Sequence, residues 1–130
     1  MEREKISQHF YRDEFACLCG CGFDAADIKL VEILEEVRNY FGVPVTIVEK
    51  GVPAELTGSA CRCAERNALV GGGDTSQHLL GKAADTTVVG VTPGRVYDYL
   101  DATYFDTLGL GLYNSFVHID VRKRKARWGK

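Results

Sequence analysis

The 130-residue sequence contains no apolar run that approaches the roughly 20 residues needed to span a bilayer, which excludes a membrane-spanning helix. It has only three prolines, no internal repeat and no low-complexity stretch, and its 45% hydrophobic and 26% charged residues exclude collagen-like, mucin-like and wholly disordered chains. The charged start of the sequence leads into no apolar segment, so no secretory signal is predicted and we expect synthesis in the cytoplasm. A chain of this length is expected to form a single domain over residues 1–130.

Acidic residues are absent from one end of the sequence. The 16 basic and 18 acidic residues give a net charge of −2, yet residues 122–130 form a tail with six basic residues and no acid. Such a tail is typical of contact with an anionic polymer, such as nucleic acid or teichoic acid, or of a solvated terminus. We favour a solvated terminus without specific nucleic-acid binding. Trp128 is the only aromatic residue in the tail, whereas single-strand binding needs several.

Five cysteines occur in two groups, at residues 17–21 and 61–63. A disulfide framework is not expected in a reducing compartment, and the C-x-C spacing differs from the C-x₂₋₄-C spacing of structural zinc sites. A second metal site, a labile disulfide and buried thiols all stay open, and we favour buried thiols. A thiol-based redox or metal sensor is therefore the least favoured function.

The hydrophobic pattern predicts two long helices, over residues 24–40 and 92–104, and a short helix over 61–69. Asp24 is the expected N-cap of the first helix, Gly42 ends it, and Thr92 caps the last one before Pro93. Strands are predicted over residues 43–49, 85–89, 108–113 and 116–122, the last two joined as a hairpin. Helices and strands do not alternate regularly, which favours the α+β class with a small, mostly antiparallel sheet flanked by helices.

Polar and apolar residues alternate in the last predicted strand. Val117, Ile119 and Val121 are expected to face the core. The opposite face then carries His118 and Asp120 side by side. This face is either the wet side of an edge strand or part of a site.

A second histidine strengthens the interpretation as a site. His78 precedes Asp85 by seven residues, with small residues between them, and His118 lies on a separate strand. Two imidazole nitrogens and one carboxylate oxygen make three protein ligands for Zn²⁺ and leave a fourth position for water, as in catalytic sites. His9, the remaining histidine, is expected to be exposed and without a partner.

Two segments of the sequence resemble a known family: residues 76–85, with the pattern S-x-H-x-x-G-x-A-x-D, and residues 116–122, with FVHIDVR. They are similar to the zinc D-Ala-D-Ala carboxypeptidases, a family that includes L-Ala-D-Glu endolysins of phages and shares its fold with the hedgehog signalling domain. The cysteine and glycine patterns at residues 15–22, 59–67 and 71–72 resemble a short phage and prophage branch of that family.

The resemblance implies a zinc metallopeptidase that hydrolyses the stem peptides of peptidoglycan, at a D-Ala-D-Ala or an L-Ala-D-Glu bond. It implies that His78, Asp85 and His118 hold the Zn²⁺. It further implies that Arg62 binds a substrate carboxylate, which suits the bidentate guanidinium, and that Ser76 contacts substrate or stabilises its own loop. We expect a monomer that acts at the cell wall after release.

One position departs from the family pattern. Many members have an acid three residues before the last zinc ligand, where this sequence has Ser115, which cannot accept a proton from water. Asp120 is our candidate for the general base. It could instead orient a ligand imidazole or pair with Arg122. The missing acid also leaves an alternative function, a non-catalytic zinc-containing module that binds wall peptide or a protein.

Overall fold

The computed structural model of the chain describes residues 5–14, 27–48 and 82–129. The helix expected over 61–69, the glycines at 71–73 and the five cysteines lie outside the described residues. In the part of the chain that is described, neither helix has the length and apolar character that crossing a bilayer requires.

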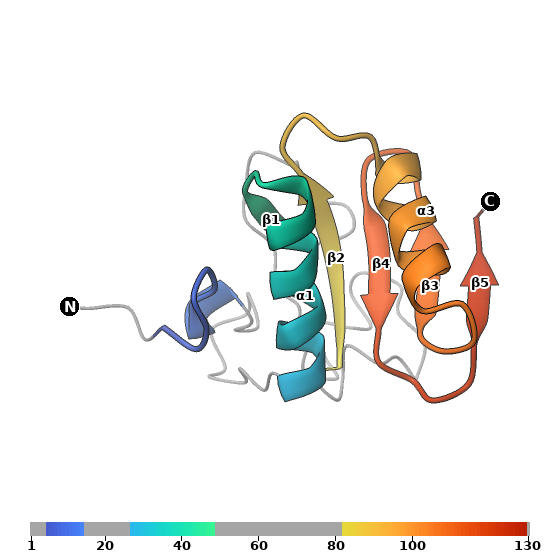
Figure 1. The fold of residues 1–130 in the computed structure, drawn as a ribbon, viewed down its shortest axis with the longest axis horizontal. Helices are drawn as coiled ribbons and strands as arrows, with labels where there is room; N and C mark the ends of the chain where they lie inside the picture. The colour runs from blue at the N-terminus through green and yellow to red at the C-terminus, as the bar shows by residue number, and fades with distance from the viewer. Residues whose placement is uncertain (1–4, 15–26, 49–81, 130) are drawn as a thin grey trace, which may run out of the picture.

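The described residues contain one sheet of five strands. These are β1 (Val45–Val48), β2 (Ala83–Val88), β3 (Gly109–Leu112), β4 (Val117–Asp120) and β5 (Ala126–Trp128). Their order across the sheet is β1-β2-β4-β3-β5, as Figure 1 shows from left to right. All neighbouring strands run antiparallel except β3 and β5, which are parallel. The predicted α+β class with a mostly antiparallel sheet is therefore confirmed.

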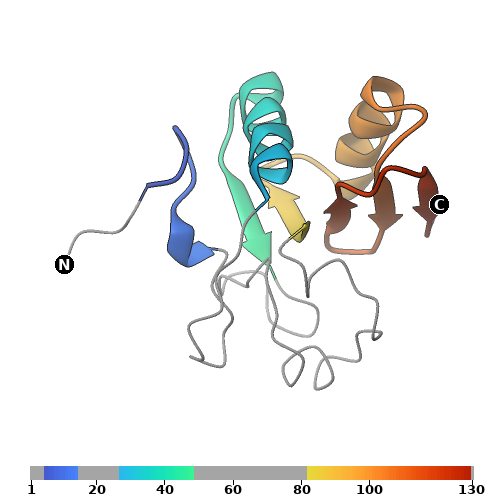
Figure 2. The ribbon, with the colours of Figure 1, turned by 90° about the horizontal axis from the view of Figure 1, so that it is seen from below.

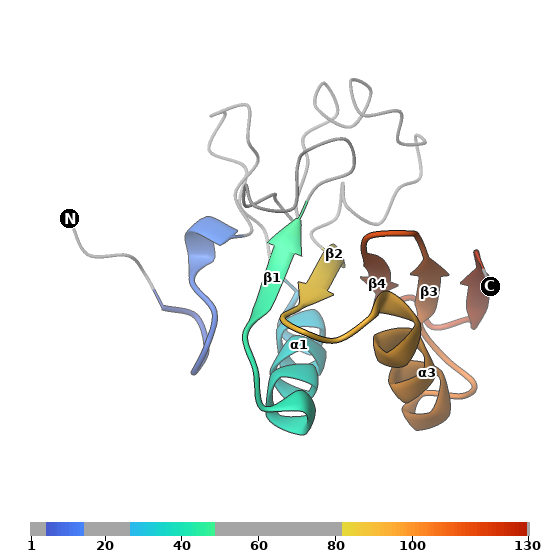
Figure 3. The same ribbon diagram turned by 90° about the horizontal axis from the view of Figure 1, so that it is seen from above.

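Both helices lie on the same face of this sheet. Helix α1 (Ile28–Phe41) packs on β1 and β2, and α3 (Pro93–Thr103) packs mainly on β3 and β4. Figure 2 shows the two helices together on one side of the strands, and Figure 3 shows the same layers from the opposite direction. The helices contact each other through Tyr40 and Tyr99, whose stacked rings have centroids 4.0 Å apart.

The first helix begins later than the sequence suggests. Asp27, not Asp24, is the N-cap, because its carboxylate accepts a hydrogen bond from the backbone N–H of Lys29 at 2.8 Å. Gly42 ends the helix in the left-handed conformation, with φ of 69°, as predicted. Thr92 caps α3 ahead of Pro93, also as predicted.

The core lies between the helices and the sheet. Val117 and Ile119 of β4 are fully buried there, together with Leu34 of α1 and Leu100 of α3. The alternation predicted for this strand is thus confirmed, since its odd-numbered residues pack beneath the helices. The even-numbered residues of β4 lie on the opposite face, away from both helices.

The N-terminal segment is attached to α1 by a histidine. The backbone N–H of His9 donates to Glu35 at 2.7 Å, and the Nδ1 of His9 lies 2.6 Å from the other oxygen of that carboxylate. The expectation that His9 has no partner is wrong. Neighbouring Phe10 is buried in the core, and this draws His9 to the surface of α1.

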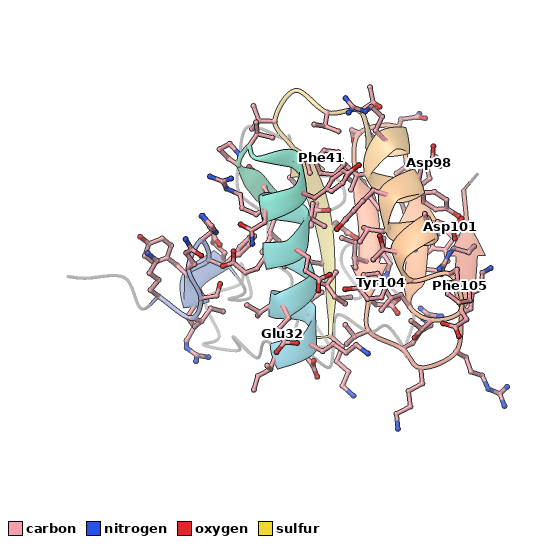
Figure 4. The ribbon with its side chains drawn as sticks, in the orientation of Figure 1. Glu32, Phe41, Asp98, Asp101, Tyr104 and Phe105 are labelled. Carbon is pink, nitrogen blue, oxygen red and sulfur yellow. The ribbon has the colours of Figure 1, made fainter. Side chains whose placement is uncertain are left out.

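The basic tail is part of the fold. Its Ala126–Trp128 form β5, and Arg127 is largely buried. The Arg127 guanidinium donates to Asp101 of α3 at 2.7 Å and to four backbone carbonyls (Figure 4 labels Asp101). The interpretation of this tail as a solvated terminus is therefore wrong for its described residues 122–129, although Lys123, Arg124 and Lys125 are exposed.

Candidate metal centre

A row of residues crosses the sheet on the face away from the helices. The antiparallel register pairs Asp85 of β2 with His118 of β4, and His118 with Gly111 of β3. The parallel register then pairs Gly111 with Trp128 of β5. Because paired residues in a sheet point to the same face, the side chains of this row are neighbours.

The imidazole of His118 contacts a carboxylate through each of its nitrogens. Nδ1 lies 2.9 Å from Asp85 and Nε2 lies 2.8 Å from Asp120, and the ring is only 12% exposed. Burial alone would lower the pKa of His118, but the two carboxylates raise it above its ordinary value. Both nitrogens can donate only when the ring carries a positive charge.

Asp120 is completely buried and accepts hydrogen bonds at both carboxylate oxygens. Arg122 donates to it twice through its guanidinium, at 2.7 Å each, and the backbone N–H of Gly109 donates at 3.1 Å. Burial by itself would raise the pKa of Asp120, but the hydrogen bonds from His118 and Arg122 hold it well below its usual range. Such a carboxylate is a strong anchor for the imidazole and a weak acceptor for a further proton.

Two glycines of β3 make this arrangement possible, and the sequence interpretation did not identify them. A Cβ atom at Gly109 would lie closer than 3.0 Å to both carboxylate oxygens of Asp120, and one at Gly111 would collide with the Trp128 ring. Alternate glycines in a predicted strand are the signal that was available, since they indicate a close approach from one face of the sheet.

The structure brings three of the predicted site residues together. Asp85, His118 and Asp120 form one hydrogen-bonded chain, although Asp85 and His118 are 33 residues apart in the sequence. The predicted residues Arg62, Ser76 and His78 lie outside the described residues. Ser115 is exposed in the turn between β3 and β4.

The Asp85–His118 pair offers two donor types that zinc binds, an imidazole nitrogen and a carboxylate oxygen. Zinc holds such atoms at about 2.0–2.2 Å, so two ligand atoms of one tetrahedral ion lie roughly 3.4 Å apart. Nδ1 of His118 and the facing oxygen of Asp85 are 2.9 Å apart, a hydrogen-bond distance, so the two groups would separate by about 0.5 Å to share the ion. These two side chains would serve as ligands, and the hydrogen bond from Nε2 of His118 to Asp120 would orient the ring. Within the described ranges no group of three or more His, Cys, Asp or Glu side chains is arranged to hold a metal.

Comparison with known proteins gives one match. A family model described as Peptidase M15 matches residues 8–120, which is most of the chain and includes Asp85, His118 and Asp120. No curated protein and no solved structure matches the sequence.

Proposed function

The chain belongs to the peptidase M15 family, and on that premise we propose that it is a zinc-dependent peptidase that hydrolyses the stem peptides of peptidoglycan. The observation that carries the proposal is the Asp85–His118 pair on the sheet face away from the helices, where Nδ1 of His118 lies 2.9 Å from a carboxylate oxygen of Asp85. Membership of the family supports a peptide substrate. The sequence resemblance supports the choice of peptidoglycan.

We assign three ligands to the zinc. Asp85 and His118 supply one oxygen and one nitrogen, and His78 supplies the second nitrogen of the set that the resemblance implies. When bound, zinc lowers the pKa of a coordinated water and polarises the carbonyl of the scissile bond. The carboxylate of Asp85 also reduces the net positive charge of such a site.

In this proposal, the residues that hold the substrate lie outside the described part of the chain. Arg62 binds a carboxylate of the stem peptide through two parallel hydrogen bonds, and Ser76 contacts the peptide near it. Fixing the peptide in this way places the scissile bond beside the metal and removes much of the entropic cost of the reaction.

The contacts of Asp120 support an orienting role over a role as general base. Its two oxygens already accept from His118, from Arg122 and from the backbone of Gly109. A carboxylate that accepts from the second nitrogen of a ligand histidine fixes the ring and its tautomer. We propose that Asp120 does this for His118, so that a different group would act as the base that accepts the proton of the attacking water.

The alternative is a non-catalytic zinc-containing module that binds wall peptide or a protein. The observation that favours it is Ser115, an exposed hydroxyl where the family often has an acid. In such a module the metal would stabilise the fold, and binding would occur without cleavage.

Digestion of purified muropeptides distinguishes the two functions. The zinc-loaded chain is incubated with muropeptides, with and without a chelator, and the products are weighed by mass spectrometry. The peptidase proposal predicts a mass loss that identifies the bond cut and that disappears with the chelator. Intact muropeptides that still bind to the zinc-loaded chain would show that the protein is a binding module.

A further inference from the structure

We propose that Trp128 forms one wall of the substrate site, where its indole ring contacts an aliphatic side chain next to the scissile bond. This inference rests on the proposed function and deepens it, because it assigns the substrate preference to a residue outside the zinc-ligand motifs. The suggested ligand is a small aliphatic residue such as alanine.

The position of the indole ring follows from the register of the sheet. Gly111 lies between His118 and Trp128 in the row across β4, β3 and β5, and it has no side chain to separate them. The indole therefore lies over Gly111, and its centroid is 5.1 Å from that of the imidazole at an angle of 45°. Asp85 flanks the imidazole on β2, so the ring of His118 has a carboxylate toward one side and an indole toward the other.

Neighbouring side chains hold this ring in place. Its Nε1–H donates to the hydroxyl of Tyr113 at 3.1 Å, and the guanidinium of Arg122 lies 5.4 Å from its centroid. Tyr113 in turn stacks on Phe116 with centroids 4.4 Å apart. The indole is thus fixed before substrate arrives, which reduces the entropic cost of binding.

The chemistry of this wall selects the ligand. Trp128 is half-buried, so part of its apolar surface remains accessible beside the metal-binding imidazole. Among the described residues, Arg122 has its guanidinium beside this ring, and its two hydrogen bonds to Asp120 already pair its charge with a carboxylate. The accessible apolar surface of the indole therefore favours contact with an aliphatic side chain over a charged one.

Kinetics of three variants on the muropeptide that the wild-type chain cleaves test the proposal. Trp128→Ala should raise KM by roughly 5- to 20-fold through lost apolar contact, Trp128→Phe should raise it less, and both should keep stoichiometric zinc. Phe105→Ala is the matched control, because Phe105 is an exposed aromatic side chain on the loop after α3, 67% accessible to solvent. Folded, zinc-loaded Trp128→Ala and Trp128→Phe variants that both have the KM and kcat of the wild type, for substrates carrying alanine or glutamate at that position, would overturn it.

A second measurement separates this inference from the proposed function. Trp128 is the single tryptophan of the chain, so its emission reports on its own surroundings. Adding D-Ala-D-Ala or L-Ala-D-Glu to the zinc-loaded wild-type chain should shift or quench that emission in a saturable way for at least one of the two dipeptides. If the wild type cleaves no muropeptide, the proposed function fails. A saturable emission change would still support the role of Trp128 in binding the dipeptide. If the chain cleaves muropeptides but its emission responds to neither dipeptide, the role of Trp128 is overturned and the proposed function stands.

Discussion

At the scale of single residues, the alternation in β4 predicted which side chains share a face. The family resemblance, and no local pattern, placed Asp85 with His118, and pairing with Arg122 was one of three alternatives for Asp120. His118 and Asp120 are two residues apart on one strand, so the strand period places them together. The partner of His118 on β2 depends on the pairing of distant segments, which no local pattern encodes. The role of Asp120 also stayed open because its contacts with Arg122 and Gly109 arise only in the folded sheet.

Asp120→Asn measures the role of this carboxylate. Asparagine keeps the size of the side chain but loses the charge that anchors the imidazole, so we expect zinc affinity to fall by roughly 10- to 100-fold. Competition with a chelating dye gives that affinity. A general base would instead show full zinc occupancy and a turnover lower by roughly 10²- to 10⁴-fold. Normal affinity and normal turnover would exclude both roles and direct the search to Asp74 or Asp106.

Gly109→Ala tests the space beneath the same carboxylate. The added methyl group would meet both oxygens of Asp120 and the guanidinium of Arg122, so we expect a loss of about 1–3 kcal/mol in the free energy of unfolding and weaker zinc binding. Denaturant titration measures the first quantity.

The control for that variant is Gly94→Ala in α3, where a Cβ atom meets nothing within 4 Å. We expect this change to be neutral or stabilising by up to about 1 kcal/mol. Equal effects at Gly109 and Gly94 would show that the close approach to Asp120 is unimportant.

At the scale of helices and strands, the sequence predicts the two helices and four of the strands, and it misses β5. Ala126, Arg127 and Trp128 include no β-branched residue, and the charges before them are typical of a solvated tail. The strand forms because β3 offers a free edge and because Arg127 finds Asp101 and the carbonyls at the end of α3. These partners are distant in the sequence, so only the fold reveals them.

Arg127→Lys should reduce the stability of the fold far more than its conserved charge suggests. A lysine cannot reproduce the five hydrogen bonds that the guanidinium makes to Asp101 and to backbone carbonyls, so we expect a loss of about 2–3 kcal/mol in the free energy of unfolding. Thermal or denaturant unfolding measures this loss. Arg124→Lys, at an exposed position of the same tail, should change it by less than about 0.5 kcal/mol. Similar values for the two variants would contradict the anchoring role of Arg127.

The attachment of the N-terminal segment to α1 should depend on pH. Burial would raise the pKa of Glu35, but the polar groups of the segment around it, His9 among them, lower it from its ordinary value of 4.5. A lowered pKa means that the folded state favours the ionised carboxylate. This stabilisation is fully present above the ordinary pKa of 4.5 and is lost as the pH falls through the lowered pKa of the folded state.

Glu35→Gln tests this dependence. We expect the variant to lose about 1–2 kcal/mol in the free energy of unfolding at pH 7, and the difference from wild type to shrink as the pH falls below about 4. Glu32→Gln, an exposed position of the same helix, serves as the control. A difference at Glu35 that is the same at pH 7 and pH 3.5 would contradict an ionic attachment.

At the scale of the whole molecule, the two faces of the sheet differ in what they contact. One face packs against α1 and α3 and forms the core, and the other presents the row from Asp85 to Trp128. The fold class could be predicted because periodicity and hairpin signals are local. Two of the three proposed zinc ligands, Asp85 and His118, lie in the described part of the chain as neighbours on paired strands. His78, Arg62 and Ser76 lie outside the described residues.

The measurement that tests the central claim most directly is the zinc content of three purified chains by elemental analysis: the wild type, His118→Ala and His9→Ala. His9 is the matched control, because its Nδ1 also lies within hydrogen-bond distance of a carboxylate, that of Glu35, but it lies on the helix side of the molecule. The account predicts one zinc per chain in the wild type and in His9→Ala, and none in His118→Ala. A His118→Ala chain that retains one tightly bound zinc would contradict it.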